Sequence, residues 1–344
     1  MYNDTNVNIT GGEIKAYSSA IGSYSDKTSG ETITGTIKVS NGKLSGDNGY
    51  AILINTNEDF ISSRDIEISG GELYGKNYAI RIGKESEGKL TISGGTIHSD
   101  VFSAIYNYYG NGNITIKGGT ITSESGSALA NRGNTKIEID GGELLADKAA
   151  TINTYNTYDM VIKGGTIKNT GRKNAILLND DGKLAIEGGT ITSQEGIAIL
   201  HNGSGKLEIG KDDGTVSTTE PEVIGKTTGI KTQNGFDFYD GVLKGEEKSY
   251  DGEINKIPEG YELEEENELE LKTIKLKSKT PTTIQGDING DGKITATDLL
   301  KMKRYIVYLE EFSEEEIKRG DMNEDNEITT TDLLKVKRII VGLE

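Results

Sequence analysis

One four-residue signature, Gly-Gly followed by Thr or Glu and then Ile or Leu, recurs along most of the chain at a nearly constant spacing. Complete copies begin at Gly11, Gly70, Gly94, Gly118, Gly141, Gly164 and Gly188. From Gly70 onward the intervals are 24, 24, 23, 23 and 24 residues, and degenerate copies near residues 41, 213 and 240 extend the series. A second column of Ala-Ile pairs keeps the same phase. A fixed period of this length indicates stacked structural repeats rather than an ordinary globular domain.

Within one repeat, apolar residues alternate with polar ones. Leu90 and Ile92 fall on one face of a short strand, the Gly pair turns the chain, and Ile97 begins the next strand. Three short strands with their turns fill about 24 residues, the length of one coil of a parallel β-helix. We therefore expect a mainly β fold in which residues 1–245 form about ten coils around a ladder of aliphatic side chains. The predicted ladder consists of Ile9, Ile68, Ile92, Ile116, Ile139, Ile162 and Ile186.

Polar residues recur at interior positions of the same repeat. Asn107, Asn131 and Asn153 each lie three residues after the Ala of their coil, which predicts a stacked ladder of side-chain amides that bind turn backbone groups. His201 falls on the same interior parity, so we interpret it as a hydrogen-bonded ladder residue rather than a general base. His98 follows Ile97 and is expected to point outward.

After Leu243 the repeat fades into a segment in which Glu alternates with Leu. We interpret residues 246–277 as a β cap over the last coil, because an open coil edge would otherwise recruit other strands. Residues 278–285 contain Pro281 among small polar neighbours and are predicted to form an extended linker. Residues 286–344 then change to a helical composition, so a second domain begins there.

Two copies of a calcium-type loop, 34 residues apart, dominate this second domain. Oxygen-bearing side chains stand at loop positions 1, 3, 5, 9 and 12, and position 7 offers a backbone carbonyl. Gly292 and Asn326 occupy the position of the sharp turn, where left-handed backbone favours Gly and then Asn. The predicted ligands of two calcium ions are Asp287, Asn289, Asp291, Lys293 through its carbonyl, Thr295 and Asp298, and then Asp321, Asn323, Asp325, Glu327 through its carbonyl, Thr329 and Asp332.

Each loop runs into a helix, and the segment Ser313 to Glu316 has the capping-box spacing that starts another short helix. The duplicated loop and helix, the single Asp at position 12 and the Lys-Arg pairs resemble a type I dockerin over residues 286–344. This resemblance implies two EF-hand-like calcium loops and docking onto a cohesin domain of a scaffolding protein, with two orientations permitted by the near-symmetry of the halves. It further implies cohesin contacts by Ala296, Thr297, Lys303, Arg304, Thr330, Thr331, Lys337 and Arg338.

Dockerins act outside the cell, so the resemblance predicts a secreted, cellulosome-type component whose leader is absent from this chain and which a scaffold can hold at a cell surface. The formal charge of −17 argues against nucleic-acid binding. No stretch approaches the roughly 20 apolar residues of a membrane helix, so we expect no membrane insertion. The lack of Cys excludes thiolate metal sites and cysteine nucleophiles. We expect a monomer before docking.

The Gly-Gly-Thr-Ile coils resemble the right-handed β-helix proteins of the pectate-lyase-like superfamily, and especially the repeat regions of secreted bacterial surface and carbohydrate-binding proteins. That fold hosts lyases, hydrolases, adhesins and binders, so it leaves the activity open. We favour an accessory module that binds polysaccharide. The alternatives are a pectate-lyase-like enzyme and a surface adhesin. An enzyme would need acidic residues on adjacent coils, for which Asp159 and Asp180, in loops after the Ala-Ile strands, are candidates; no catalytic residue is assigned.

Sugar binding favours aromatic side chains, whose faces stack on pyranose rings. The chain has no Trp but 16 Tyr, and several of these cluster in adjacent repeats. Arginine residues in the same repeats would either attract a uronate or pair with nearby Glu. The candidate carbohydrate-binding surface consists of Tyr106, Tyr108, Tyr109, Tyr155 and Tyr158 with Arg81 and Arg132.

Overall fold

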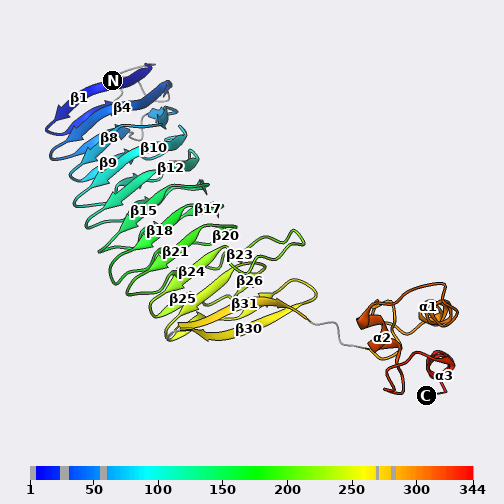
Figure 1. Ribbon diagram of the computed structural model, residues 1–344. Coiled ribbons are helices and arrows are strands. Elements are labelled where there is room, and N and C mark those ends of the chain that lie inside the picture. Colours follow the sequence, from blue (N-terminus) through cyan, green and yellow to red (C-terminus); the bar gives the residue numbers. More distant parts are fainter. Residues whose placement is uncertain (1–4, 24–30, 55–59, 269–270, 280–283, 344) are drawn as a thin grey trace. The chain divides into compact units, whose positions relative to one another are not determined.

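The computed structural model describes residues 5–23, 31–54, 60–268, 271–279 and 284–343. The chain divides into two compact units, residues 1–277 and residues 278–344. The first unit is a stack of parallel β coils that ends in antiparallel strands, and the second is a set of three short helices with two intervening loops (Figure 1). Each unit is described by itself.

Two long sheets form the first unit, and successive coils add parallel strands to both (Figure 1). The ten-stranded sheet consists of β2 (Ser19–Ser23), β5 (Tyr50–Ile54), β9 (Tyr78–Ile82), β11 (Ile105–Asn107), β13 (Leu129–Asn131), β16 (Ile152–Thr154), β19 (Ile176–Leu178), β22 (Ile199–His201), β25 (Thr228–Thr232) and β28 (Lys248–Asp251). The 19-stranded sheet consists of β1 (Val7–Ala16), β4 (Thr36–Gly46), β7 (Asp65–Ile68), β8 (Glu72–Gly75), β10 (Leu90–Ser99), β12 (Ile114–Ser123), β14 (Thr135–Ile139), β15 (Glu143–Ala146), β17 (Thr157–Ile162), β18 (Thr166–Asn169), β20 (Lys183–Ile186), β21 (Thr190–Ser193), β23 (Leu207–Ile209), β24 (Glu222–Gly225), β26 (Phe236–Phe238), β27 (Val242–Gly245), β29 (Ile254–Lys256), β30 (Tyr261–Glu268) and β31 (Leu271–Ser278). A further parallel pair joins β3 (Glu31–Ile33) to β6 (Phe60–Ser62). The ten rungs of the smaller sheet confirm the prediction of about ten coils.

The interior ladder follows from the pairing register of the coils. Ile92 pairs with Ile68 on one side and with Ile116 on the other, so these side chains stack directly above one another. The predicted ladder residues from Ile68 to Ile186 are all buried, whereas Ile9 in the first coil is half-buried. The mainly β fold with an aliphatic ladder is therefore confirmed.

The Gly pair turns the chain at each of its copies. The expected separate strands on its two sides are present as β7 and β8, β14 and β15, β17 and β18, and β20 and β21, whereas β10 runs through the pair as one strand of 10 residues whose pairing with β12 shifts register on either side. Gly95 has a φ of +86°, which L side chains rarely adopt. A Cβ built there would lie 2.9 Å from backbone atoms of Gly70 and Gly71 in the preceding coil. The corner therefore requires Gly for both its conformation and its packing.

The polar ladder is present, with one correction. The Nδ2 group of Asn107 donates to Oδ1 of Asn131 at 2.7 Å and to the carbonyl of Gly110 at 3.1 Å, and both Asn side chains are buried. The prediction for Asn153 is wrong, because Asn153 pairs with Ala130 while the buried Thr154 pairs with Asn131. In this coil Thr151 stands between the Ala and the Ile, so the interior position is set by the distance from the Ile.

The end of the stack lies further along the chain than the repeat indicates. Strands β28 and β29 pair in parallel with β25 and β26, so the coils continue past residue 245 to Lys256. β31 then pairs antiparallel with β27, and β30 lies between β29 and β31 in the sheet. Ile274 and Leu276 of β31 are buried in the core. These antiparallel strands are the expected β cap. Of the expected linker, residues 280–283 lie outside the described residues.

The second unit contains α1 (Ala296–Ile306), α2 (Glu314–Gly320) and α3 (Thr330–Ile340). Each begins with a capping box, in which the N-cap Thr295, Ser313 or Thr329 binds the third helical residue reciprocally. The predicted short helix at Ser313 is confirmed. The second unit has a small buried core formed by Ile288, Met302, Ile328 and Val336. None of the helices in the described part of the chain is long and apolar enough to cross a membrane.

Candidate functional site

The first candidate calcium loop is organised around Asp287. One carboxylate oxygen of Asp287 accepts the backbone N–H groups of Gly290 and Asp291 at 2.9 and 3.2 Å, and the other accepts that of Gly292 at 2.8 Å. Gly290 and Gly292 have φ values of +73° and +83°. The loop therefore curls around the carboxylate in a conformation that depends on Gly at these two positions.

Asp298 closes the same loop from the start of α1. Its Oδ1 accepts the N–H of Asn289 at 3.0 Å, and its Oδ2 accepts the N–H and hydroxyl of Thr295 at 2.9 and 3.1 Å. The side chain is fully buried, as Asp287 nearly is. Position 12 of the loop thereby serves also as the N3 residue of the helix, which couples the loop's shape to the helix start.

The second loop repeats these contacts. Asp332 accepts the N–H groups of Met322 and Thr329 at 2.9 and 2.8 Å, and Asp321 accepts that of Asp325 at 3.1 Å. Asn326 at the sharp turn has a φ of +67°, the left-handed conformation that its position requires. Sequence reasoning missed a second strained position, Glu324, with a φ of +61° where the first loop has Gly290.

The charge balance of the two loops fits a bound cation. Asp287, Asp298, Asp321 and Asp332 are all buried, and none forms an ion pair with a Lys or Arg of the described residues. A buried carboxylate without a positive partner costs several kcal/mol. All the side-chain donors gathered here are oxygens, which hard cations such as Ca²⁺ prefer. The residues present therefore fit the metal that the sequence predicts.

The predicted cohesin-contacting residues all lie on the surface of the second unit. Ala296, Thr297, Lys303, Arg304, Thr330, Thr331, Lys337 and Arg338 are exposed. Sequence reasoning missed the apolar residues beside them, of which Leu300 and Leu334 are 56% and 55% exposed. A surface hollow of about 340 Å³ lined by Lys303, Arg304, Val307 and Leu333 lies between α1 and α3. The sequence could have identified these two Leu residues, because Leu300 and Leu334 are 34 positions apart, as the two loops are.

The predicted carbohydrate-binding Tyr residues gather on the coils around β11. Tyr106 stacks on Tyr78 with ring centroids 5.0 Å apart, and Tyr78 stacks in turn on Tyr50 at 5.8 Å and on Phe102 at 5.2 Å. Tyr106, Tyr108 and Tyr109 continue the cluster at 5.9 and 4.8 Å. Tyr50, Tyr78 and Phe102 were not predicted, although Tyr50 and Tyr78 directly precede the Ala of their coils.

The two predicted Arg residues stack on this cluster. The guanidinium carbon of Arg81 lies 5.2 Å from the ring centroid of Tyr108, and that of Arg132 lies 5.1 Å from that of Tyr155. The side chain of Tyr158 lies outside the described residues. We call the following set the aromatic face: Tyr50, Tyr78, Arg81, Phe102, Tyr106, Tyr108, Tyr109, Arg132 and Tyr155.

Burial raises the pKa of the Tyr78 and Tyr106 phenols, and the guanidinium groups of Arg81 and Arg132 act in the opposite direction. Neither Arg forms an ion pair with a carboxylate of the described residues. The aromatic face therefore carries two positive charges that no carboxylate in the described part of the chain neutralises.

Of the two acidic candidates for catalysis, Asp180 lies in the predicted loop after β19 and Asp159 does not. Asp159 lies within β17, paired with Lys183, and not in a loop. Asp180 is buried, and its carboxylate accepts the N–H of Gly182 at 3.3 Å. His201 is fully buried, with Nδ1 3.2 Å from the hydroxyl of Thr232, and burial lowers the pKa of its imidazole. The interpretation of His201 as an interior ladder residue agrees with this position.

The comparisons with known proteins concern the second unit. Residues 285–341 match the family model described as the Dockerin type I domain. Neither the comparison with curated proteins nor that with solved structures returned a match. The duplicated loops, the capping boxes and the exposed 34-residue symmetry agree with this family. Residues 285–341 are therefore a dockerin type I domain, the module by which a cellulosome-type component docks onto a cohesin domain.

Proposed function

We propose that this chain is an accessory component that binds acidic polysaccharide through the aromatic face and is attached by its dockerin to a cohesin-bearing scaffold. The observation that carries the proposal is the charge of that face. In a chain of formal charge −17, Arg81 and Arg132 stand among aromatic rings without a carboxylate partner in the described residues. Unneutralised guanidinium groups favour a ligand that brings its own anions.

The stacking geometry indicates which atoms meet the sugar. Tyr78 and Tyr106 are stacked at an interplanar angle of 15°, so each covers part of the other's ring face. Phe102, Tyr109 and Tyr155 remain 48%, 43% and 46% exposed. These three rings offer the apolar surface for pyranose stacking, while the phenol hydroxyls and the two Arg forks supply hydrogen bonds. Tyr109 also holds a left-handed φ of +57°, a strained conformation of the kind that occurs at binding sites.

In the same proposal each dockerin loop holds one calcium ion. Asp287, Asn289, Asp291, Thr295 and Asp298 would bind the first with the carbonyl of Lys293, and the corresponding residues of the second loop, beginning at Asp321, would bind the second. The ion supplies the positive charge that the buried carboxylates lack, and it thereby holds the loops that start α1 and α3. Those helices carry the basic pairs Lys303-Arg304 and Lys337-Arg338 toward the cohesin.

A dockerin implies an extracellular component, and the proposal places the β-helix there as well, secreted and in contact with polysaccharide. Cohesin binding would hold the β-helix close to whatever the scaffold carries, which raises the effective concentration of a weak polysaccharide contact. The proposal assigns no catalytic residue to the β-helix.

Affinity electrophoresis of the full chain in gels containing polygalacturonate or a neutral galactan tests the proposal. We expect retention by polygalacturonate that weakens as salt is added. The double variant Arg81→Gln with Arg132→Gln should lose about tenfold or more in affinity, since each charge-assisted hydrogen bond contributes roughly 1.5–3 kcal/mol. Lys231→Gln is the matched control, because Lys231 lies on β25 of the same sheet and is paired with Asp251.

The double variant Tyr106→Ala with Tyr108→Ala separates the rings from the charges. Unchanged retention of this variant would show that the rings of Tyr106 and Tyr108 play no part. Lack of retention of the wild-type chain by either polysaccharide would reject a binding role for the aromatic face.

A further inference from the structure

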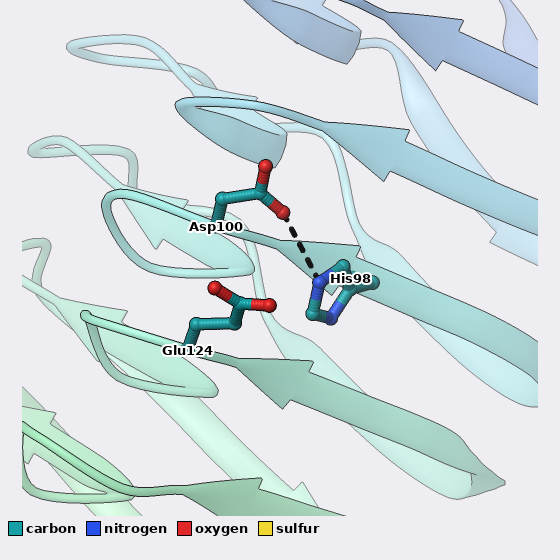
Figure 2. Close-up of side chains that lie close together, drawn as sticks. All are labelled: His98, Asp100 and Glu124. Carbon is teal, nitrogen blue, oxygen red and sulfur yellow. Dashed lines mark ion pairs between the residues drawn. The ribbon is translucent and has the colours of Figure 1, made fainter.

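A second surface cluster lies on the other sheet, at the corner where β10 and β12 end. His98 belongs to β10, Asp100 follows β10 in the turn, and Glu124 follows β12 one coil later (Figure 2). Ser99 pairs with Ser123, so Asp100 and Glu124 occupy the same place in adjacent coils. The imidazole and the two carboxylates each offer one ligand atom, and these atoms all lie within 4.8 Å of one another.

Neighbouring coils orient the imidazole and Asp100. The Nδ1 atom of His98 lies 2.7 Å from the hydroxyl of Thr122, which leaves Nε2 facing Asp100 at 3.2 Å. The hydroxyl of Tyr74 donates to the second oxygen of Asp100 at 2.6 Å. Tyr74 and Thr122 are the register partners of His98 on its two sides. Metal-binding histidines and carboxylates are held in this way by hydrogen bonds from residues that do not touch the ion.

The two carboxylates of this cluster have no Lys or Arg partner among the described residues. Some other outward acids of the same sheet are paired in register with Lys, as in Lys38–Glu67 at 2.8 Å and Lys43–Glu72 at 3.4 Å.

At the corner the pattern breaks. Among the described residues, the one ion pair of Asp100 is with His98, and Glu124 forms none. Lys76 holds the corresponding place one coil before Asp100 but forms no ion pair with it. Two carboxylates stacked on adjacent coils repel each other unless a cation lies between them.

A surface hollow of about 440 Å³, lined in part by Asp47, Tyr74 and His98, gives solvent access to this corner.

We propose that His98, Asp100 and Glu124 form a site for a divalent transition-metal ion of the Zn²⁺ type, separate from the dockerin loops. The donor set is one imidazole nitrogen and two carboxylate oxygens, which favours Zn²⁺ over Ca²⁺ because Ca²⁺ takes oxygen donors. Three protein ligands on an open corner leave further coordination positions for water or an oxygen-bearing ligand. The turn that supplies Asp100 also carries Phe102 of the aromatic face, two residues later.

Zn²⁺ titration of the full chain, saturated with Ca²⁺ and labelled with ¹³C-histidine, tests the site. The chain has two His, so each ring has its own NMR signal. We expect the His98 signal to move at one equivalent of Zn²⁺ while the buried His201 signal stays, and calorimetry to show one site. Glu124→Gln should weaken binding by about tenfold or more if Glu124 is a ligand.

Asp147→Asn is the matched control, because Asp147 occupies the same place one coil after Glu124 and lies outside the cluster. It should leave Zn²⁺ affinity within about twofold of the wild type, and His98→Gln should abolish binding. Glu124 is exposed, so its variant is expected to fold, and circular dichroism checks this. A His98 signal that does not move, or Zn²⁺ binding equally tight in Glu124→Gln, would overturn the proposal. The second result would reduce the cluster to the His98–Asp100 ion pair.

Discussion

Replacing Gly95 with Ala tests whether the Gly corner is required by its own conformation or by the stacking of coils. Gly95 and Gly12 have nearly the same left-handed backbone, with φ values of +86° and +79°. A Cβ at Gly95 would lie 2.9 Å from the backbone of the preceding coil, whereas a Cβ at Gly12 would have no heavy atom within 4 Å. The two substitutions therefore share the backbone strain and differ in the clash.

The magnitudes follow from these two contributions. A left-handed Ala costs about 1–2 kcal/mol, and the reduced freedom of the unfolded chain returns about 0.4–1 kcal/mol, so Gly12→Ala should destabilise by about 1 kcal/mol. Overpacking adds about 1–3 kcal/mol, so Gly95→Ala should destabilise by about 2–4 kcal/mol. At about 1.4 kcal/mol per factor of ten, amide exchange should accelerate about fivefold around Gly12 and about 30- to 700-fold around Gly95.

Hydrogen exchange measured by mass spectrometry on the full chain resolves the two sites, because peptides from β1 and from β10 report their own coils. A local readout is needed since a solenoid opens coil by coil. Equal acceleration in the two variants would show that the proximity of the preceding coil does not demand Gly at this corner. A Gly95→Ala variant without any effect would refute the strain argument as well.

Two further outcomes are expected. Burial lowers the pKa of His201 below its usual value near 6.5. As the pH is lowered below 6.5, the imidazole of the unfolded chain therefore binds a proton while that of the folded chain resists protonation. The free energy of unfolding should decrease as the pH is lowered through that range. Urea unfolding at several pH values should show a shallower decline in His201→Asn, and an identical slope would contradict the argument. Chelation of Ca²⁺ should lower the helical circular dichroism of the dockerin and its affinity for cohesin, because Asp287, Asp298, Asp321 and Asp332 are buried and form no ion pair with a described Lys or Arg. Unchanged helicity and cohesin affinity would reject calcium as the missing charge.

Much of the fold could be predicted because each coil repeats the same pattern of apolar and Gly residues. The ladder from Ile68 to Ile186 needs only the alternation of apolar residues and a constant coil length. The errors arose where a coil departs from that length. Counting from the Ala placed Asn153 inside, whereas counting from Ile152 would have placed Thr154 there, since Ile152 pairs with Leu129. Alternation likewise puts Asp159, next to the buried Met160, in a strand.

The dockerin loops could be located from the sequence because the proposed ligands of each loop lie within twelve positions of one another. The coil surfaces could not. Tyr78 and Tyr106 meet diagonally across two coils, and His98 meets Thr122 and Glu124 only through the register of β10 with β12. A shift of one residue in that register would separate these groups. Sequence alone therefore shows His98 as a lone exposed imidazole.

A parallel β-helix separates its fold from its function in a simple way. Inward columns hold the coils together, and outward columns place residues 23 or 24 positions apart side by side without affecting the core. On several coils outward charges form Lys–Glu pairs such as Lys43–Glu72. The aromatic face instead groups the positive charges of Arg81 and Arg132, and the corner of Asp100 and Glu124 groups two negative charges. Both are built on the coils between residues 50 and 155, joined by the turn that carries Asp100 and Phe102. Like charges brought together on adjacent coils are the physical reason for proposing the binding functions on these coils.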